Sequence, residues 1–105
     1  MQKPAINSTF LDNFTVLHLS AQRNLVVVSR VLLKLGANVN AISSFGRTPL
    51  MIAVLKKNLK MVSFLLNNNA NIDIQDREKN TCTHFASEKG FIEILKLILE
   101  KKPNL

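Results

Sequence analysis

One spacing, a period of 33 residues, runs through almost the whole chain and constrains its fold more than any other feature. Thr15, Thr48 and Thr81 mark three successive copies of this period. Further segments recur at the same offset without gaps, namely Leu32-Leu33, Leu65-Leu66 and Ile98-Leu99, then Ala37-Asn38-Val39-Asn40 and Ala70-Asn71-Ile72-Asp73. A period of roughly 20–50 residues is typical of proteins built from stacked repeats, each of which buries its apolar face against its neighbours.

The most regular copy of the period begins with the segment 46–50, Gly-Arg-Thr-Pro-Leu, which predicts the start of a helix. Glycine turns the backbone at little steric cost. The hydroxyl of Thr48 can cap the first free amides, and Pro49 suits the first helical position because no N–H is needed there. Val16 and Cys82 replace this proline in the first and third copies, which therefore begin less regularly.

The pattern Gly-x-Thr-Pro-Leu-x-x-Ala, followed by Leu-Leu-x-x-(Gly/Asn)-Ala-Asn, resembles the ankyrin repeat. The resemblance implies an all-α fold, a solenoid of helix–turn–helix units joined by β-turn loops. It divides the chain into a segment 1–14, made of the tail of a preceding repeat and the first loop, then repeats 15–47 and 48–80 and a truncated repeat 81–105. Segment 3–7 lies three periods before the C-terminus, which favours an origin in a longer array; the alternative is a small protein with a short lead-in.

The repeat register predicts helices over 16–24, 25–35, 49–57, 60–67, 82–89 and 92–101. The three valines at 26–28 alone favour a strand. The register favours a helix there, because the aligned segments 61–66 and 94–99 have helical periodicity. The third repeat departs most from the pattern, since Lys79, Cys82 and Thr83 replace the turn glycine, the proline and a core leucine. We therefore expect it to open more readily than the others.

Composition indicates a single globular domain, because 47% of the 105 residues are hydrophobic and only 20% are charged. The lone cysteine excludes an internal disulfide and favours an intracellular location, cytoplasmic or nuclear. The N-terminus has no apolar segment of the kind found in signal peptides. The most apolar runs, 25–35 and 91–99, are interrupted by charges and are shorter than the roughly 20 apolar residues of a membrane span.

The residues that carry catalytic chemistry elsewhere point to structural roles here, so we expect no enzyme, no cofactor and no metal site. The resemblance implies that His18 and His84 join adjacent loops by hydrogen bonds. It places them in a structural motif with Thr15, Thr48, Pro49 and Thr81. Cys82 lies near a helix start, where a thiol pKa can be lowered, but only His84 lies near it in sequence. A structural zinc needs four ligands, and the single cysteine with the two histidines supplies only three. The three glycines are isolated from one another, so the sequence has no glycine-rich loop of the kind that binds phosphate.

The resemblance implies that partners meet the loop tips and the exposed face of the first helix of each repeat. Ten residues at these positions are candidate partner-binding residues: Phe14, Gln22, Arg23, Phe45, Arg47, Leu55, Lys56, Arg77, Asn80 and Lys89. Exposed aromatic residues beside arginines are typical of binding hot spots. An open alternative is that Phe14 and Phe45 fold back onto neighbouring turns as part of a minor core.

We therefore expect a protein–protein interaction module with a rigid concave surface and a protein partner of acidic character, given the net charge of +7. One alternative is a basic face that binds nucleic acid or anionic lipid, which the even spread of the charges makes less favourable. Another is a structural spacer within a larger protein. Residues Leu97, Ile98 and Leu99 are expected in the core. Because no polar cap is evident at the last helix, self-association through uncapped ends is also expected.

Overall fold

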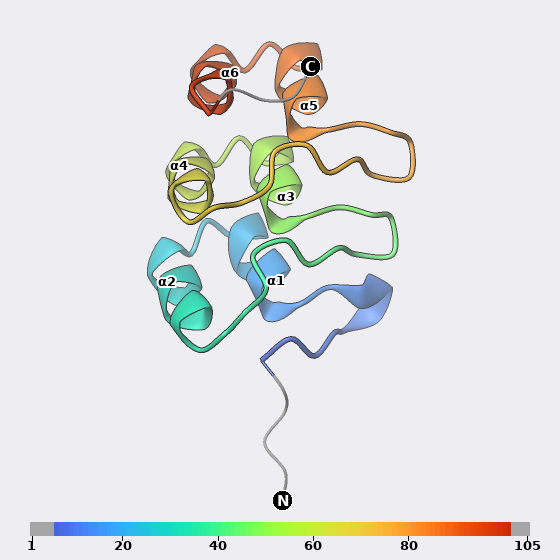
Figure 1. Cartoon of the computed structure of the whole chain (residues 1–105), viewed down its shortest axis with the longest axis vertical. Helices are drawn as coiled ribbons and strands as arrows, with labels where there is room; N and C mark the ends of the chain where they lie inside the picture. Colours follow the sequence, from blue (N-terminus) through green and yellow to red (C-terminus); the bar gives the residue numbers. More distant parts are fainter. Residues whose placement is uncertain (1–5, 102–105) are drawn as a thin grey trace, which may run out of the picture.

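The computed structural model describes residues 6–101, which form six helices arranged as three stacked pairs (Figure 1). The pairs are α1 (Val16–Gln22) with α2 (Val26–Lys34), α3 (Pro49–Leu55) with α4 (Leu59–Asn67), and α5 (Cys82–Glu88) with α6 (Ile92–Leu99). A short 3₁₀ turn, η1 (Leu11–Asn13), precedes α1. Residues 6–101 contain no β-strand, only an isolated bridge between Thr9 and Thr15. The all-α prediction is therefore confirmed.

The helices lie in two layers, with the loops that connect the pairs extending to one side (Figure 1). Helices α1, α3 and α5 form the layer next to the loops, and each contacts the next along the stack. Helices α2, α4 and α6 form the outer layer in the same way. Residues 1–5 and 102–105 lie outside the described residues, so most of the expected tail of a preceding repeat (3–7) and the end of the truncated third repeat are not described.

The helix boundaries differ from the predicted ones by one or two residues. Helix α1 ends at Gln22 and α3 at Leu55, because Asn24 and Lys57 adopt left-handed backbone angles with φ of 59° and 57°. Helix α6 ends at Leu99, after which the chain tightens into a turn in which the Lys101 N–H donates to the Ile98 carbonyl over 3.0 Å. The valines at 26–28 are helical, as the repeat register predicted.

Threonine side chains cap the first helix of each pair. The hydroxyls of Thr15, Thr48 and Thr81 each accept a hydrogen bond from the backbone N–H three residues later, at 3.2, 3.2 and 3.4 Å. In the first and third pairs the histidine at that later position also accepts a hydrogen bond from the threonine N–H, which completes a capping box. The second pair instead places Pro49 at the first helical position.

The middle pair is the best buried part of the stack, because other helices cover it on both sides. Leu50, Met51, Val54, Met61 and Leu65 are each at most 1% exposed. The core extends into the third pair through Ala86, Ile94 and Ile98. Of the three residues expected in the core at the end of α6, Ile98 is fully buried and Leu97 is half-buried. Leu99, in contrast, is 45% exposed, because within residues 6–101 no helix pair covers α6 on its far side.

Backbone hydrogen bonds hold neighbouring loops together and so position their tips. The Ser44 N–H donates to the Asp12 carbonyl at 2.8 Å, and the Arg77 N–H donates to the Phe45 carbonyl at 2.9 Å. The three loop tips therefore form one connected edge of the molecule. No helix within residues 6–101 is long and apolar enough to cross a membrane.

Candidate protein-binding site

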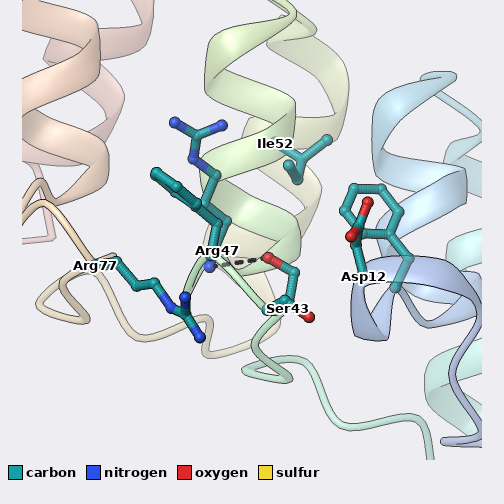
Figure 2. Close-up of a pocket in the computed structure, with 8 residues that line it drawn as sticks. Asp12, Ser43, Arg47, Ile52 and Arg77 are labelled. Carbon is teal, nitrogen blue, oxygen red and sulfur yellow. Dashed lines mark hydrogen bonds between the residues drawn. The ribbon is translucent and has the colours of Figure 1, made fainter.

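The three loop tips and α3 border an open pocket of about 460 Å³, which we call the tip pocket. Its lining includes four of the ten candidate binding residues, Phe14, Phe45, Arg47 and Arg77. The other lining residues are Asp12, Ser43, Ser44 and Ile52. Figure 2 shows Arg77 and Asp12 on opposite sides of the pocket, with Ile52 projecting from α3 above it. The pocket thus combines apolar walls with a cationic side and an anionic side.

The two loop phenylalanines have different environments. Phe14 is half-buried and its ring stacks on His18, with the centroids 4.9 Å apart. Phe45 is 41% exposed, and the guanidinium of Arg47 lies over its ring, at 4.8 Å from the centroid. Phe14 therefore belongs mainly to the minor core, whereas Phe45 keeps an accessible aromatic face in the tip pocket.

Arg47 connects the second and third loops. Its Nε lies 3.5 Å from Oδ2 of Asp76, whose side chain is fully buried. This contact is an ion pair without hydrogen-bond geometry. The guanidinium also lies 5.5 Å from the ring centroid of Phe85 on α5. Because Asp76 balances its charge, Arg47 contributes less positive charge to the pocket than the sequence suggested.

Asp76 closes the third loop from the inside. Its Oδ1 accepts hydrogen bonds from the N–H groups of Glu78 and Asn80, both at 2.9 Å. Asn80 closes the same loop with its backbone, since its carbonyl accepts from the Asp76 N–H at 2.9 Å. Asn80 does not line the tip pocket. The structure gives this candidate binding residue a place in the loop framework.

Arg77 carries the positive charge on the other side of the pocket. Its side chain is exposed, and within residues 6–101 it makes no ion pair or side-chain hydrogen bond. Its backbone N–H is held by the Phe45 carbonyl, so the base of the side chain has a defined position. The guanidinium is therefore available to a carboxylate brought by another molecule.

The remaining candidate binding residues lie away from the tip pocket. They occupy the opposite ends of α1, α3 and α5, where Gln22 and Leu55 are the last helical residues and Arg23, Lys56 and Lys89 are the C-caps. Leu55 is half-buried and not exposed as expected. The side-chain amide of Asn58 joins the first two of these helix ends by donating to the carbonyls of Ala21 and Gln22, at 3.0 and 3.3 Å.

Four lining residues were not among the ten candidates from the sequence, namely Asp12, Ser43, Ser44 and Ile52. The Ser43 N–H donates to the Arg47 carbonyl at 2.9 Å, and its hydroxyl accepts from the Arg47 N–H at 3.2 Å (Figure 2). Ser43 aligns with Asp76 in the repeat, and both residue types close turns with their side chains, which is a signal that the sequence contained. Ile52 follows the core pattern of α3, so its contribution to the pocket had no separate signal.

His18 holds the first two loops together from a buried position. It is 0% exposed, its Nδ1 accepts from the Thr15 N–H at 3.0 Å, and its Nε2 lies 2.8 Å from the Arg47 carbonyl. These partners require a neutral ring with its proton on Nε2. Burial lowers the pKa of His18 below its ordinary value of 6.5, and its backbone hydrogen bonds oppose this only in part.

Cys82 is not activated by its position at a helix start. It is 1% exposed, and its Sγ lies 3.6 Å from the Ile72 carbonyl. Burial raises the pKa of the thiol to about 11, the opposite of the lowering that a nucleophilic cysteine needs. Residues 6–101 also contain no group of three or more side chains that could hold a metal ion.

Comparison with known proteins agrees with the stacked helix pairs and their threonine caps. A family model described as ankyrin repeats in three copies matches residues 2–76. The chain belongs to the ankyrin-repeat family. Members of this family are generally protein-interaction modules, and the family points to a binding module without catalytic activity. The match ends before α5, but α5 begins with the same capping box as α1.

Individual ankyrin-repeat relatives cover most or half of this chain. A protein of Oryza sativa subsp. japonica described as "Probable E3 ubiquitin-protein ligase XBOS31" is 35% identical over 96 residues, 90% of this chain. Inversin of Gallus gallus is 38% identical over 60 residues, and inversin of Danio rerio is 40% identical over 57 residues. The chain spans only 22% of the rice protein, 5% of the chicken inversin and 6% of the zebrafish inversin.

Proposed function

We propose that this ankyrin-repeat chain binds a partner protein in the tip pocket, which holds an apolar side chain of the partner beside a carboxylate. The observation that carries the proposal is the meeting of Phe45, Arg77 and Ile52, from two loops and α3, around one pocket. The apolar walls suit an aliphatic or aromatic side chain, and Arg77 suits an acidic residue next to it. We expect the partner to be a cytoplasmic or nuclear protein, because Cys82 is a free thiol and these compartments keep thiols reduced.

The tip pocket also favours an orientation for the bound segment. Arg77 and Asp12 lie on opposite sides of the pocket. A partner segment with a carboxylate at one end and a cation or amide donor at the other matches both sides. The loops that form the pocket are already joined by backbone hydrogen bonds, so little conformational entropy is lost when the partner binds.

Binding of nucleic acid or anionic lipid is the second candidate function, and the net charge of +7 supports it. The two candidates differ in their dependence on salt and on Phe45. Binding to nucleic acid weakens steeply as salt rises and depends little on one aromatic side chain. Binding in the tip pocket is expected to respond strongly to loss of Phe45 and only moderately to salt. The third candidate, a structural spacer, predicts no interaction that depends on salt or on Phe45.

A crosslinking pull-down with matched variants tests the proposal. The test variant is Phe45→Ala with Arg77→Ala, because a change at Arg47 would also leave the Asp76 carboxylate without its partner. The control is Lys79→Asn, which removes one charge from the same loop outside the pocket and keeps a residue type that tolerates positive φ. Proteins captured by wild type and control but lost with the test variant support the tip pocket. Equal capture by all three chains argues against it.

A further inference from the structure

Within residues 6–101, large apolar side chains are exposed mainly in the first repeat and the loops that flank it. Eight of them precede residue 43, among them Phe10, Val28 and Val31, which are 58%, 42% and 51% exposed. The other four within residues 6–101 follow that position, namely Phe45, Leu59, Ile92 and Leu99. Exposed apolar groups gathered at one end of a molecule indicate a contact surface. Within residues 6–101, no helix pair covers the outer side of the first pair.

The repeat register identifies which of these side chains lie at contact positions. Val28 aligns with Met61 and Ile94, which are 0% and 2% exposed. Phe10 aligns with Ser43 and Asp76, and Leu19 aligns with Ile52 and Phe85, all four of which are buried. In the second and third pairs, the preceding pair covers these positions. We define Phe10, Leu19, Val28 and Val31 as the N-terminal face.

The opposite end of the stack has a matching set of uncovered positions. His84 and Ser87 are exposed, whereas the aligned residues His18 and Ala21 of the first pair are 0% exposed because the second pair covers them. Leu99 is 45% exposed, whereas the aligned Leu66 is 5% exposed. We define His84, Ser87, Leu95 and Leu99 as the C-terminal face.

A hydrogen bond inside the molecule shows how the two faces fit. His18 Nε2 donates to the Arg47 carbonyl, which also accepts from the Ser43 N–H at 2.9 Å. His84 has the same capping box as His18, but its Nε2 has no partner within residues 6–101. The residues of the first loop that align with Ser43 and Arg47 are Phe10 and Phe14. The Phe10 N–H donates to the Phe14 carbonyl at 2.7 Å, which leaves a lone pair for one further donor.

We propose that two copies of this chain associate head to tail, with the C-terminal face of one copy packed on the N-terminal face of the other. His84 Nε2 of the first copy then donates to the Phe14 carbonyl of the second, as His18 does to Arg47 within one chain. The contact is heterologous, so it extends to longer rows as concentration rises.

Sedimentation velocity over a hundredfold range of concentration tests the association, and the N-terminal face offers a matched control. The test variant is Val28→Lys with Val31→Lys, since both side chains are already partly exposed and a lysine at either position can extend into solvent. The control is Val27→Lys, which aligns with the exposed Lys60 and stays outside the contact. We expect concentration-dependent association of the wild type and the control, and association at least about tenfold weaker for the test variant.

Mixing of variants distinguishes head-to-tail association from other arrangements. A second variant, Ser87→Lys with Leu99→Lys, disables the C-terminal face. Each variant alone is expected to be a monomer, and an equimolar mixture of the two is expected to form a dimer that grows no further. A wild type that stays monomeric at every concentration overturns the proposal. Association that survives loss of the C-terminal face also overturns it, because it indicates contact between two N-terminal faces.

Discussion

His18 makes the stability of the stack depend on pH. Burial lowers the pKa of His18 in the folded state below the ordinary value of 6.5. Below pH 6.5 the unfolded chain therefore binds a proton at this histidine more strongly than the folded chain does. The contribution of His18 is complete above a pH of about 6.5 and is lost as the pH falls toward the folded-state pKa, with a slope of at most about 1.4 kcal/mol per pH unit. Urea unfolding of wild type at several pH values measures this loss.

The variant His18→Met isolates the contribution of this histidine, because Met51 occupies the aligned position of the second pair. The free energy of unfolding of the variant is expected to depend less on pH between about 7.5 and about 5.5 than that of wild type. Equal pH dependence of the two proteins would contradict the structural role of the neutral ring.

Opposite substitutions at two aligned loop-tip residues, Gly46 and Lys79, are expected to change the free energy of unfolding in opposite directions. Gly46 and Lys79 align in the repeat, and their φ angles are 79° and 65°. Lys79→Gly relieves a left-handed lysine and should raise the free energy of unfolding by about 0.5–1 kcal/mol. Gly46→Ala should lower it, because the new Cβ would lie 3.1 Å from the Asp76 Cα.

The control for the loop-tip pair is Gly36→Ala. Gly36 also has a positive φ, of 94°, but a Cβ there meets no atom within 4 Å. The variant Gly36→Ala therefore reports backbone strain alone. Its loss of stability, measured by urea unfolding, should be smaller than that of Gly46→Ala. A larger loss at Gly36 would mean that the approach of the third loop to Gly46 is not close.

At the scale of single helices, Cys82 provides a probe of the opening of α5. The thiol is 1% exposed and burial raises its pKa to about 11, so alkylation of the native protein should be far slower than that of an unfolded cysteine. Because the third pair is covered on one side only within residues 6–101, we expect the alkylation rate to rise in urea below the concentration that unfolds the whole chain. A rate that rises only with global unfolding would show that α5 does not open separately.

The helices show how far the sequence predicts structure in this chain. The start of each first helix was predicted correctly because threonine caps and Pro49 act locally. The helix ends were less accurate, since Asn24 and Lys57 adopt positive φ although neither is glycine. Their conformation depends on the fixed angle between the two helices of a pair, which local sequence preferences do not contain.

At the scale of the whole molecule, the middle pair should control cooperativity. Leu65 and Ile98 align in the repeat and are both 0% exposed. Leu65→Ala and Ile98→Ala should each cost roughly 2–5 kcal/mol of local stability. Because each pair contacts only its neighbours, loss at Leu65 should weaken all three pairs, whereas loss at Ile98 should affect mainly the last one.

Hydrogen exchange of the two alanine variants distinguishes these outcomes. In Leu65→Ala, protection should fall in α1 and α5 as well as in α4. In Ile98→Ala, it should fall in α5 and α6 while α1 keeps the protection of wild type. Equal loss along the whole chain in both variants would indicate a single cooperative unit without a stability centre.

The period of 33 residues, together with the resemblance of the Thr-Pro-Leu and Leu-Leu motifs to the ankyrin repeat, predicted the family, the six helices and their stacking order. The site was predicted only in part. Spacing located the loop tips, but the roles of Phe14, Arg47 and Asn80 depend on contacts between different loops. Arg47 is balanced by Asp76, 29 positions further along the chain, and only folding brings these charges within 3.5 Å. The tip pocket and the uncovered faces likewise follow from how the pairs are stacked, because burial is a property of the neighbours that a residue meets in space.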